Sequence, residues 1–80
     1  MFYRLKAKNR AVYNAALFDS EINGLDPDMV NINDNVFDVG TGKVEKVSRL
    51  ISKYKLDILI EAEYAPNNEA YVRGGYYYYV

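Results

Sequence analysis

Residues 42–64, GKVEKVSRLISKYKLDILIEAEY, carry the two clearest secondary-structure signals of the chain. Over the first half, apolar side chains recur at helical spacing opposite a basic side, which predicts a helix over residues 42–55 with Thr41 or Gly42 as its N-cap. Over the second half, apolar residues alternate with mostly acidic ones, which predicts a half-buried strand over residues 56–65. The apolar stripe of the helix consists of Val44, Val47, Leu50, Ile51 and Tyr54.

Three other segments have the pattern of strands. Residues 2–8 alternate between apolar and basic side chains. Residues 70–79 follow a turn-forming Pro-Asn-Asn sequence at 66–68 and contain a glycine pair, so we predict that they return as the second strand of a β-hairpin with a bulge or bend. Residues 29–33 are a candidate for a short further strand inside a turn-rich, acidic loop at residues 26–38.

Residues 10–22 fit two structures. As a helix they place their apolar side chains in a narrow stripe, with Asn9 as the N-cap and an Asn-Gly stop after residue 22. As a strand they would follow a tight turn, and the charges favour this alternative, because Arg10 would lie near the positive end of a helix and Asp19 near its negative end. We favour the helix. The whole pattern then predicts a two-layer α+β domain spanning residues 1–80, with an antiparallel sheet of three to four strands and one or two helices packed on one face.

The composition excludes most catalytic chemistry. The chain has 80 residues, a net charge of −1 and no Cys, His or Trp. Without cysteine there is no disulfide, thiolate nucleophile or zinc–thiolate site, and without histidine there is no imidazole base or metal ligand. No apolar run is long enough to cross a membrane, and no leader sequence is present. We therefore expect a cytoplasmic protein that is not an enzyme, binds no cofactor and does not enter a membrane.

Two polar motifs resemble ligand sites but fit them poorly. The sequence GTGK at residues 40–43 lacks two features of a phosphate-binding loop, because Phe37 stands where the first glycine belongs and Val44 where a hydroxyl residue belongs. The Asn- and Asp-rich residues 31–38 do not have the spacing of a calcium loop. Both compositions are typical of turns and caps, so we expect no metal here.

Two sets of charged residues could instead take part in binding or catalysis. Glu61 and Glu63 share one side of a predicted strand, but the chain is too short to build a sugar cleft around them. We interpret them as a solvated sheet face opposite the basic N-terminal strand. The basic side of the predicted helix is either solvated or a contact for anions and nucleic acid; its candidate residues are Lys43, Lys46, Arg49 and Lys53.

The tyrosines are the strongest functional signal. Nine occur in the chain, and four of them are consecutive just before the last residue. In a strand, successive side chains point to opposite sides, so four adjacent rings cannot all enter one core. Tyrosine suits protein interfaces, although it also favours strands in general and can stack on nucleic-acid bases. The predicted interface residues are Tyr71, Arg73, Tyr76, Tyr77, Tyr78 and Tyr79.

These observations predict a non-catalytic module that binds another protein, or associates with itself, through its tyrosine-rich C-terminal hairpin. The acidic loop at residues 26–38 would add electrostatic complementarity. The short, cysteine-free, Asn- and Tyr-rich composition resembles accessory proteins of bacteria and their phages, so a phage or mobile-element protein that modulates or inhibits a host protein is one concrete form of this hypothesis. The alternative is a small nucleic-acid-binding domain that uses the basic helix side and stacking tyrosines.

Overall fold

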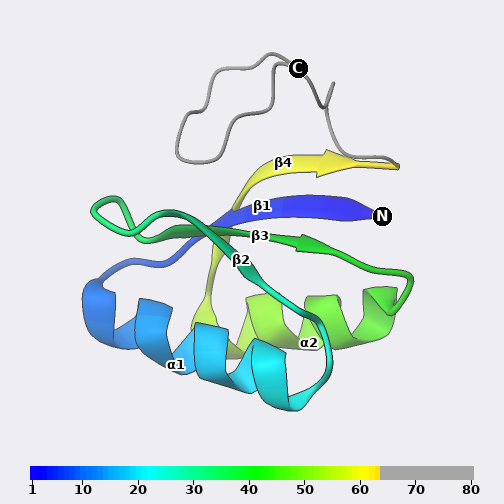
Figure 1. The fold of residues 1–80 in the computed structure, drawn as a ribbon, viewed down its shortest axis with the longest axis horizontal. Coiled ribbons are helices and arrows are strands. Elements are labelled where there is room, and N and C mark those ends of the chain that lie inside the picture. The colour runs from blue at the N-terminus through cyan, green and yellow to red at the C-terminus, as the bar shows by residue number, and fades with distance from the viewer. Residues whose placement is uncertain (64–80) are drawn as a thin grey trace.

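The computed structural model describes residues 1–63, which form a four-stranded sheet and two helices (Figure 1). The predicted strand over residues 70–79 lies outside the described residues. In chain order the elements are β1 (Phe2–Lys6), α1 (Arg10–Ile22), β2 (Asp28–Asn31), β3 (Val36–Gly40), α2 (Val44–Tyr54) and β4 (Asp57–Ala62).

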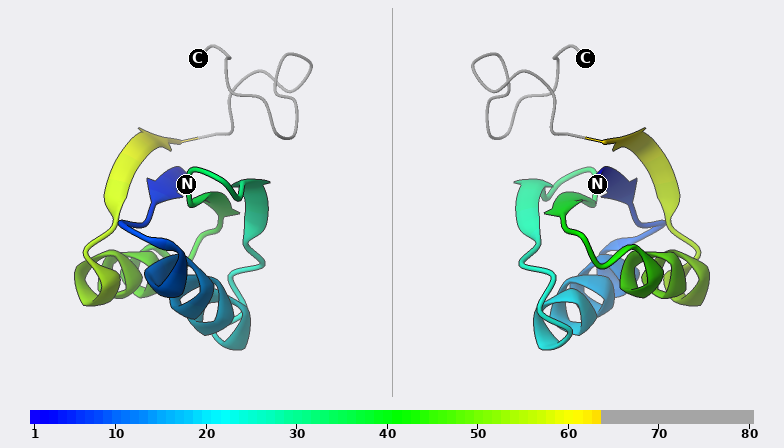
Figure 2. Two further views of the ribbon diagram at one scale, coloured as in Figure 1. Left: turned by 90° about the vertical axis from the view of Figure 1, so that its left-hand side faces the viewer. Right: turned by 90° about the vertical axis from the view of Figure 1, so that its right-hand side faces the viewer.

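The sheet has the strand order β2-β3-β1-β4, and each neighbouring pair is antiparallel. The helix α1 therefore joins two strands that lie on either side of β3, and α2 joins two strands that lie on either side of β1. This is the split β-α-β arrangement of ferredoxin-like folds. Both helices lie on the same side of the sheet (Figure 2). The predicted class, a small two-layer α+β domain with helices on one face of an antiparallel sheet, is confirmed.

Residues 10–22 form α1, the helix that we favoured for this segment. The Asn9 side chain caps it by accepting a hydrogen bond of 2.9 Å from a backbone N–H of the first turn. Arg10 and Asp19 each have a charge that is unfavourable at its end of a helix, and contacts with other parts of the chain compensate for both. Arg10 donates a hydrogen bond of 2.7 Å to the Ile32 carbonyl, and Asp19 forms an ion pair of 2.9 Å with a lysine of α2.

The prediction of an acidic loop over residues 26–38 is wrong, because strands occupy most of this segment. This segment contains β2, which confirms the candidate short strand at residues 29–33 with slightly earlier bounds. From Val36 it also contains most of β3, which the sequence patterns did not reveal. The side chains of β3 are buried on both faces of the sheet, so the strand lacks the polar alternation of a half-buried one. Only the turn at residues 32–35 has the Asn-rich character that we assigned to the whole segment, with Asn35 at a positive φ of 62°.

The helix α2 is shorter at both ends than the predicted 42–55. Its N-cap is Lys43 rather than Thr41 or Gly42, and it begins at Val44. Thr41 still stabilises the start, because its hydroxyl oxygen accepts a hydrogen bond of 2.9 Å from the Lys43 N–H. At the other end Lys55 adopts a left-handed conformation with φ 53°, which ends the helix and turns the chain into β4.

The strand β4 does not keep the simple alternation that its sequence predicts. Leu5 of β1 lies opposite Ile58, and its neighbour Arg4 lies opposite Ile60. Leu59 is therefore the extra residue of a β-bulge. Because of this bulge, Ile58 and Ile60 point to opposite faces of the sheet, although a period of two would place them on the same face.

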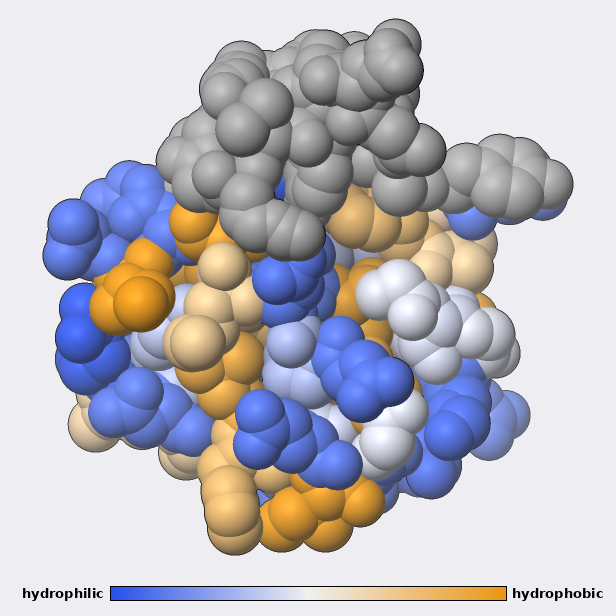
Figure 3. All heavy atoms as spheres, viewed as in Figure 1, coloured by the Kyte–Doolittle hydropathy of each residue, from blue (hydrophilic) through white to orange (hydrophobic). Residues whose placement is uncertain are grey.

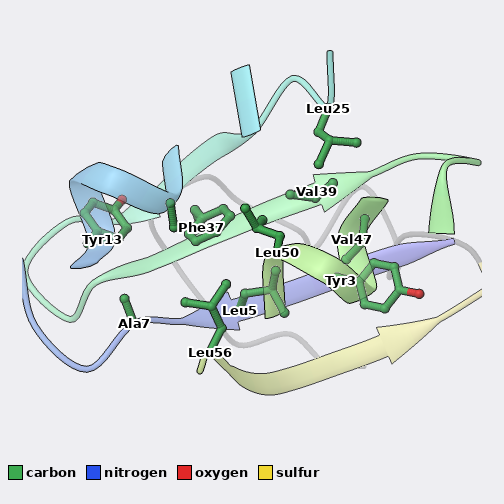
Figure 4. Packing of buried hydrophobic residues seen from close by; sticks show 11 residues of the cluster. Tyr3, Leu5, Ala7, Tyr13, Leu25, Phe37, Val39, Val47, Leu50 and Leu56 are labelled. Atoms are coloured by element: carbon green, nitrogen blue, oxygen red, sulfur yellow. The ribbon is translucent and has the colours of Figure 1, made fainter. Parts of the chain in front are cut away.

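The hydrophobic core lies between the sheet and the helices (Figure 4). Alternate residues of the two central strands point toward the helices, namely Tyr3 and Leu5 from β1 and Phe37 and Val39 from β3. Phe37 also meets the ring of Tyr13 edge to face, with 5.9 Å between the ring centroids. The other members of the cluster are Ala7, Ala16, Leu25, Val47, Leu50 and Leu56.

Candidate functional site

The sheet has two unlike faces, and the one turned away from the helices is the candidate site. We call it the far face. It is formed by the side chains that alternate with the core positions along the strands. The two central strands and β4 contribute Phe2, Arg4, Lys6, Val36, Asp38, Ile60 and Ala62.

Several far-face side chains are buried. Phe2 has 6% of its surface exposed and Val36 has 3%, yet neither belongs to the core cluster between the sheet and the helices. No helix or strand within residues 1–63 lies over this face, because α1 and α2 both cover the opposite one (Figure 2). The burial of Phe2 and Val36 on the far face is therefore not due to the helix layer.

A buried ion pair occupies the middle of the far face. Arg4 and Asp38 lie directly opposite each other on β1 and β3 and pair in a bidentate geometry, with 2.8 Å from Nε to Oδ1 and 3.0 Å from Nη2 to Oδ2. Each side chain is only 4% exposed. Removing two charges from water is costly, and parallel hydrogen bonds of this kind offset that cost only when the geometry is good. The pair fixes the register of the two central strands, because a shift by one residue would separate the charges.

A hollow of about 280 Å³ adjoins this pair. Its lining combines apolar side chains with charged groups, a combination that suits a ring with a polar end. The lining residues are Arg4, Lys6, Asp34, Val36, Leu59 and Ile60.

The four basic residues predicted to contact anions lie on the other side of the molecule, along α2. Three of them approach the C-terminal end of α1. Lys53 pairs with Asp19, Lys46 donates a hydrogen bond of 3.3 Å to the Asn23 carbonyl, and the Lys43 ammonium lies close to Gly24. Cations are favoured at this end of a helix because its free carbonyl groups carry partial negative charge. The fourth, Arg49, is exposed and lines the same groove between the helices.

One such contact and one buried ring shift the pKa values of four described residues. Hydrogen bonds from Lys53 and then Tyr54 hold the pKa of Asp19 below its ordinary value. The same contacts raise the pKa values of Lys53 and Tyr54, in both cases chiefly through the hydrogen bond to Asp19. Burial, with the charge of Glu61 as a second cause, raises the pKa of Tyr3. Asp19, Lys53 and Tyr54 join the two helices, and Tyr3 belongs to the core between the helices and the sheet.

The remaining polar motifs have structural roles. In the turn between β2 and β3, Asn31 and Asp34 hydrogen-bond each other, and no group of acidic side chains within residues 1–63 could hold a metal ion. A side chain at Gly40 or Gly42 would meet no protein atom within 4 Å, so packing does not require a glycine at either position. Glu61 lies opposite Tyr3 rather than opposite a basic residue of β1.

Among residues 1–63, the most exposed large apolar side chains lie on the outer side of α1. Phe18 and Ile22, one helical turn apart, are 65% and 66% exposed. Both belong to the narrow apolar stripe that a helix over residues 10–22 predicts, but α1 packs through Tyr13 and Ala16 instead. Figure 3 shows apolar surface at the lower edge of the molecule, where the end of α1 lies.

The six predicted interface residues, Tyr71, Arg73 and Tyr76 to Tyr79, lie outside the described residues.

No protein-family model matches the chain, and no curated protein or solved structure is similar to it. Neither α1 nor α2 has the length and apolar character needed to span a bilayer. The sequence analysis did not predict the ion pair between Arg4 and Asp38. The visible signs of it were Arg4 in an alternating strand and Asp38 among the apolar residues 36–39.

Proposed function

We propose that this protein is a non-catalytic binding module that engages another protein, or a second copy of itself, through its tyrosine-rich C-terminal segment, residues 64–80. The observation that carries the proposal is the concentration of tyrosines in this segment, which lies beyond the residues known to form the core. Eleven buried residues, all between Tyr3 and Leu56, form the core between sheet and helices. Residues 64–80 hold six of the nine tyrosines of the chain, and tyrosine combines a large apolar ring with a hydroxyl group that tolerates water, which suits a protein interface.

A binding role also agrees with the chemistry of the described residues. The shifted pKa values of Asp19, Lys53 and Tyr54 arise from a contact between the helices, and that of Tyr3 arises from its burial in the core, so each of these shifts has a structural cause. A phage or mobile-element protein that inhibits or otherwise modulates a cytoplasmic host protein is the concrete form that we favour.

The protein-binding function is preferred to nucleic-acid binding for an electrostatic reason. Lys46 and Lys53 already serve contacts inside the molecule, and the net charge of −1 gives little attraction for a polyanion. The sheet supplies a second reason. Domains of this topology that bind RNA stack bases on aromatic residues of the central strands, whereas here only β1 presents an aromatic residue on the far face, Phe2, and β3 presents Val36 and Asp38.

The proposal is tested with two matched double variants of the full chain, Tyr77→Ala/Tyr79→Ala and Tyr76→Ala/Tyr78→Ala. Each removes the rings on one side of an extended segment. Light scattering would detect self-association, and affinity capture from the native host would compare the partners retained by each variant and by the wild type. We expect at least one pair to lose the interaction, while the circular dichroism of all three proteins stays the same because the core is untouched.

Retention of the same partners and the same molar mass by both variants would contradict the proposal. Salt separates the two candidate functions. An aromatic interface should persist between about 50 and 200 mM salt, whereas contacts with phosphate weaken steeply over that range.

A further inference from the structure

The buried far face requires a cover that residues 1–63 do not provide. Phe2, Arg4, Val36 and Asp38 are each no more than 6% exposed. Both helices lie on the opposite side of the sheet (Figure 2). A bidentate ion pair that is 96% buried on a sheet face open to water would be an anomaly, because water would reach both groups.

The chain itself reaches the edge of this face. The last strand, β4, lies next to β1, and its final residue, Ala62, lies opposite Phe2 on the far face. Seventeen residues, 64–80, follow the described part. An extended chain rises about 3.3 Å per residue, and strands lie about 4.8 Å apart, so this length is enough to cross four strands and return.

The composition of residues 64–80 fits the far face. The segment contains six tyrosines and only two charged side chains, Glu69 and Arg73, which are of opposite sign. It can therefore be buried without bringing in net side-chain charge. Tyrosine rings suit the apolar side chains of Phe2 and Val36, and their hydroxyl groups can both donate to a carboxylate and accept from a guanidinium.

We propose that residues 64–80 dock on the far face of their own sheet, as a third layer that covers Arg4, Asp38 and the adjoining hollow. Along an extended segment alternate rings face the sheet, and the others face outward. The docked segment thus presents a row of tyrosines on a folded support rather than on a free tail. This inference does not depend on the proposed function, since it concerns the protein without any partner.

The absence of cysteine allows a direct test in the full-length protein. A single spin label at Lys6→Cys would sit at an exposed position of the far face, and a matched label at Arg49→Cys would sit on α2, on the other side of the molecule. Amide signals of residues 64–80 are recorded with each label oxidised and reduced. We expect loss of tail signal intensity with the Lys6→Cys label and little loss with the Arg49→Cys label.

A second sample identifies the occupant. Isotope-labelled wild type is mixed with unlabelled, spin-labelled Lys6→Cys protein, so that any loss of signal arises between molecules. Signal loss only in the directly labelled protein supports docking within one chain. Signal loss in the mixed sample would assign the face to a second copy and overturn the proposal, as would equal effects from both label positions or none from either. The partner-binding variants above are read separately, so failure of one proposal leaves the other standing.

Discussion

The two faces of the sheet are held by different physics. On the helix face, Tyr3, Leu5, Phe37 and Val39 pack against two helices, so hydrophobic burial without a defined direction is sufficient. On the far face, the centre is a bidentate ion pair whose two groups must meet atom by atom. The comparison shows that the two faces have different roles. Hydrophobic packing on the helix face holds the two layers together, whereas the ion pair on the far face determines the register of β1 and β3.

We expect the largest loss of stability from a substitution that disrupts the packing on the helix face. Phe37 is fully buried, and Phe37→Ala should lower the free energy of unfolding by about 3–5 kcal/mol through lost burial and a residual cavity. The measurement is chemical denaturation followed by circular dichroism. Phe18→Ala is the matched control, because Phe18 is 65% exposed and its loss should change stability by only about 0.5 kcal/mol. Equal losses in the two variants would contradict the described core.

The next effect separates the two faces. Arg4→Met should cost about 3–5 kcal/mol, because it leaves the carboxylate of Asp38 buried without its guanidinium. The double variant Arg4→Met/Asp38→Leu should recover much of this loss, since replacement of both charges by apolar groups is often neutral or stabilising. Additive losses in a double-mutant cycle would show that the two residues do not act as a pair.

A smaller effect tests the helix whose sequence was ambiguous. Asn9→Ala removes the side chain that caps α1 and should lower the free energy of unfolding by about 1 kcal/mol. Asn9→Asp is the control, because aspartate caps equally well and carries a charge that the start of a helix favours. A loss of stability in Asn9→Asp as large as in Asn9→Ala would show that the cap is not the source of the effect.

The smallest effect concerns the contact between the helices and depends on pH. The lowered pKa of Asp19 means that its ionised form stabilises the fold above the ordinary value of 3.8, and that this contribution is lost as the pH falls through the lower folded-state pKa. The raised pKa values of Lys53 and Tyr54 mean that their contributions are lost only in strongly alkaline solution. Asp19→Asn should therefore be less stable than wild type near neutral pH and equal to it in strong acid. The measurement is the denaturation midpoint across that range, and a difference that persists in acid would contradict this assignment.

Patterns along the chain predicted both helices and most of the strands, but not β3, one of the two central strands. Both helices were predictable, because a stripe at helical spacing and a capping asparagine are local signals. The strand β3 was not, since it is buried on both faces and contains an aspartate, which suggested a loop. Asp38 is compatible with a central strand only because Arg4 lies opposite it, and those residues are 34 positions apart in the chain.

The candidate site shows the same division. The basic side of α2 was visible in the sequence. The sequence could not reveal that three of its four basic residues, Lys43, Lys46 and Lys53, contact the C-terminal end of α1. The far face was not predicted, because a bulge at Leu59 moves Ile60 to that face against the alternation of β4.

The sequence by itself determined the class of the fold, the limits on its chemistry and the concentration of tyrosines near its end, because composition and short-range periodicity depend only on neighbouring residues. Tertiary structure decided the strand order, the pairing of Arg4 with Asp38 and the use of the basic residues of α2. Each of these depends on groups that are distant in the chain, and they meet only when the two layers have formed.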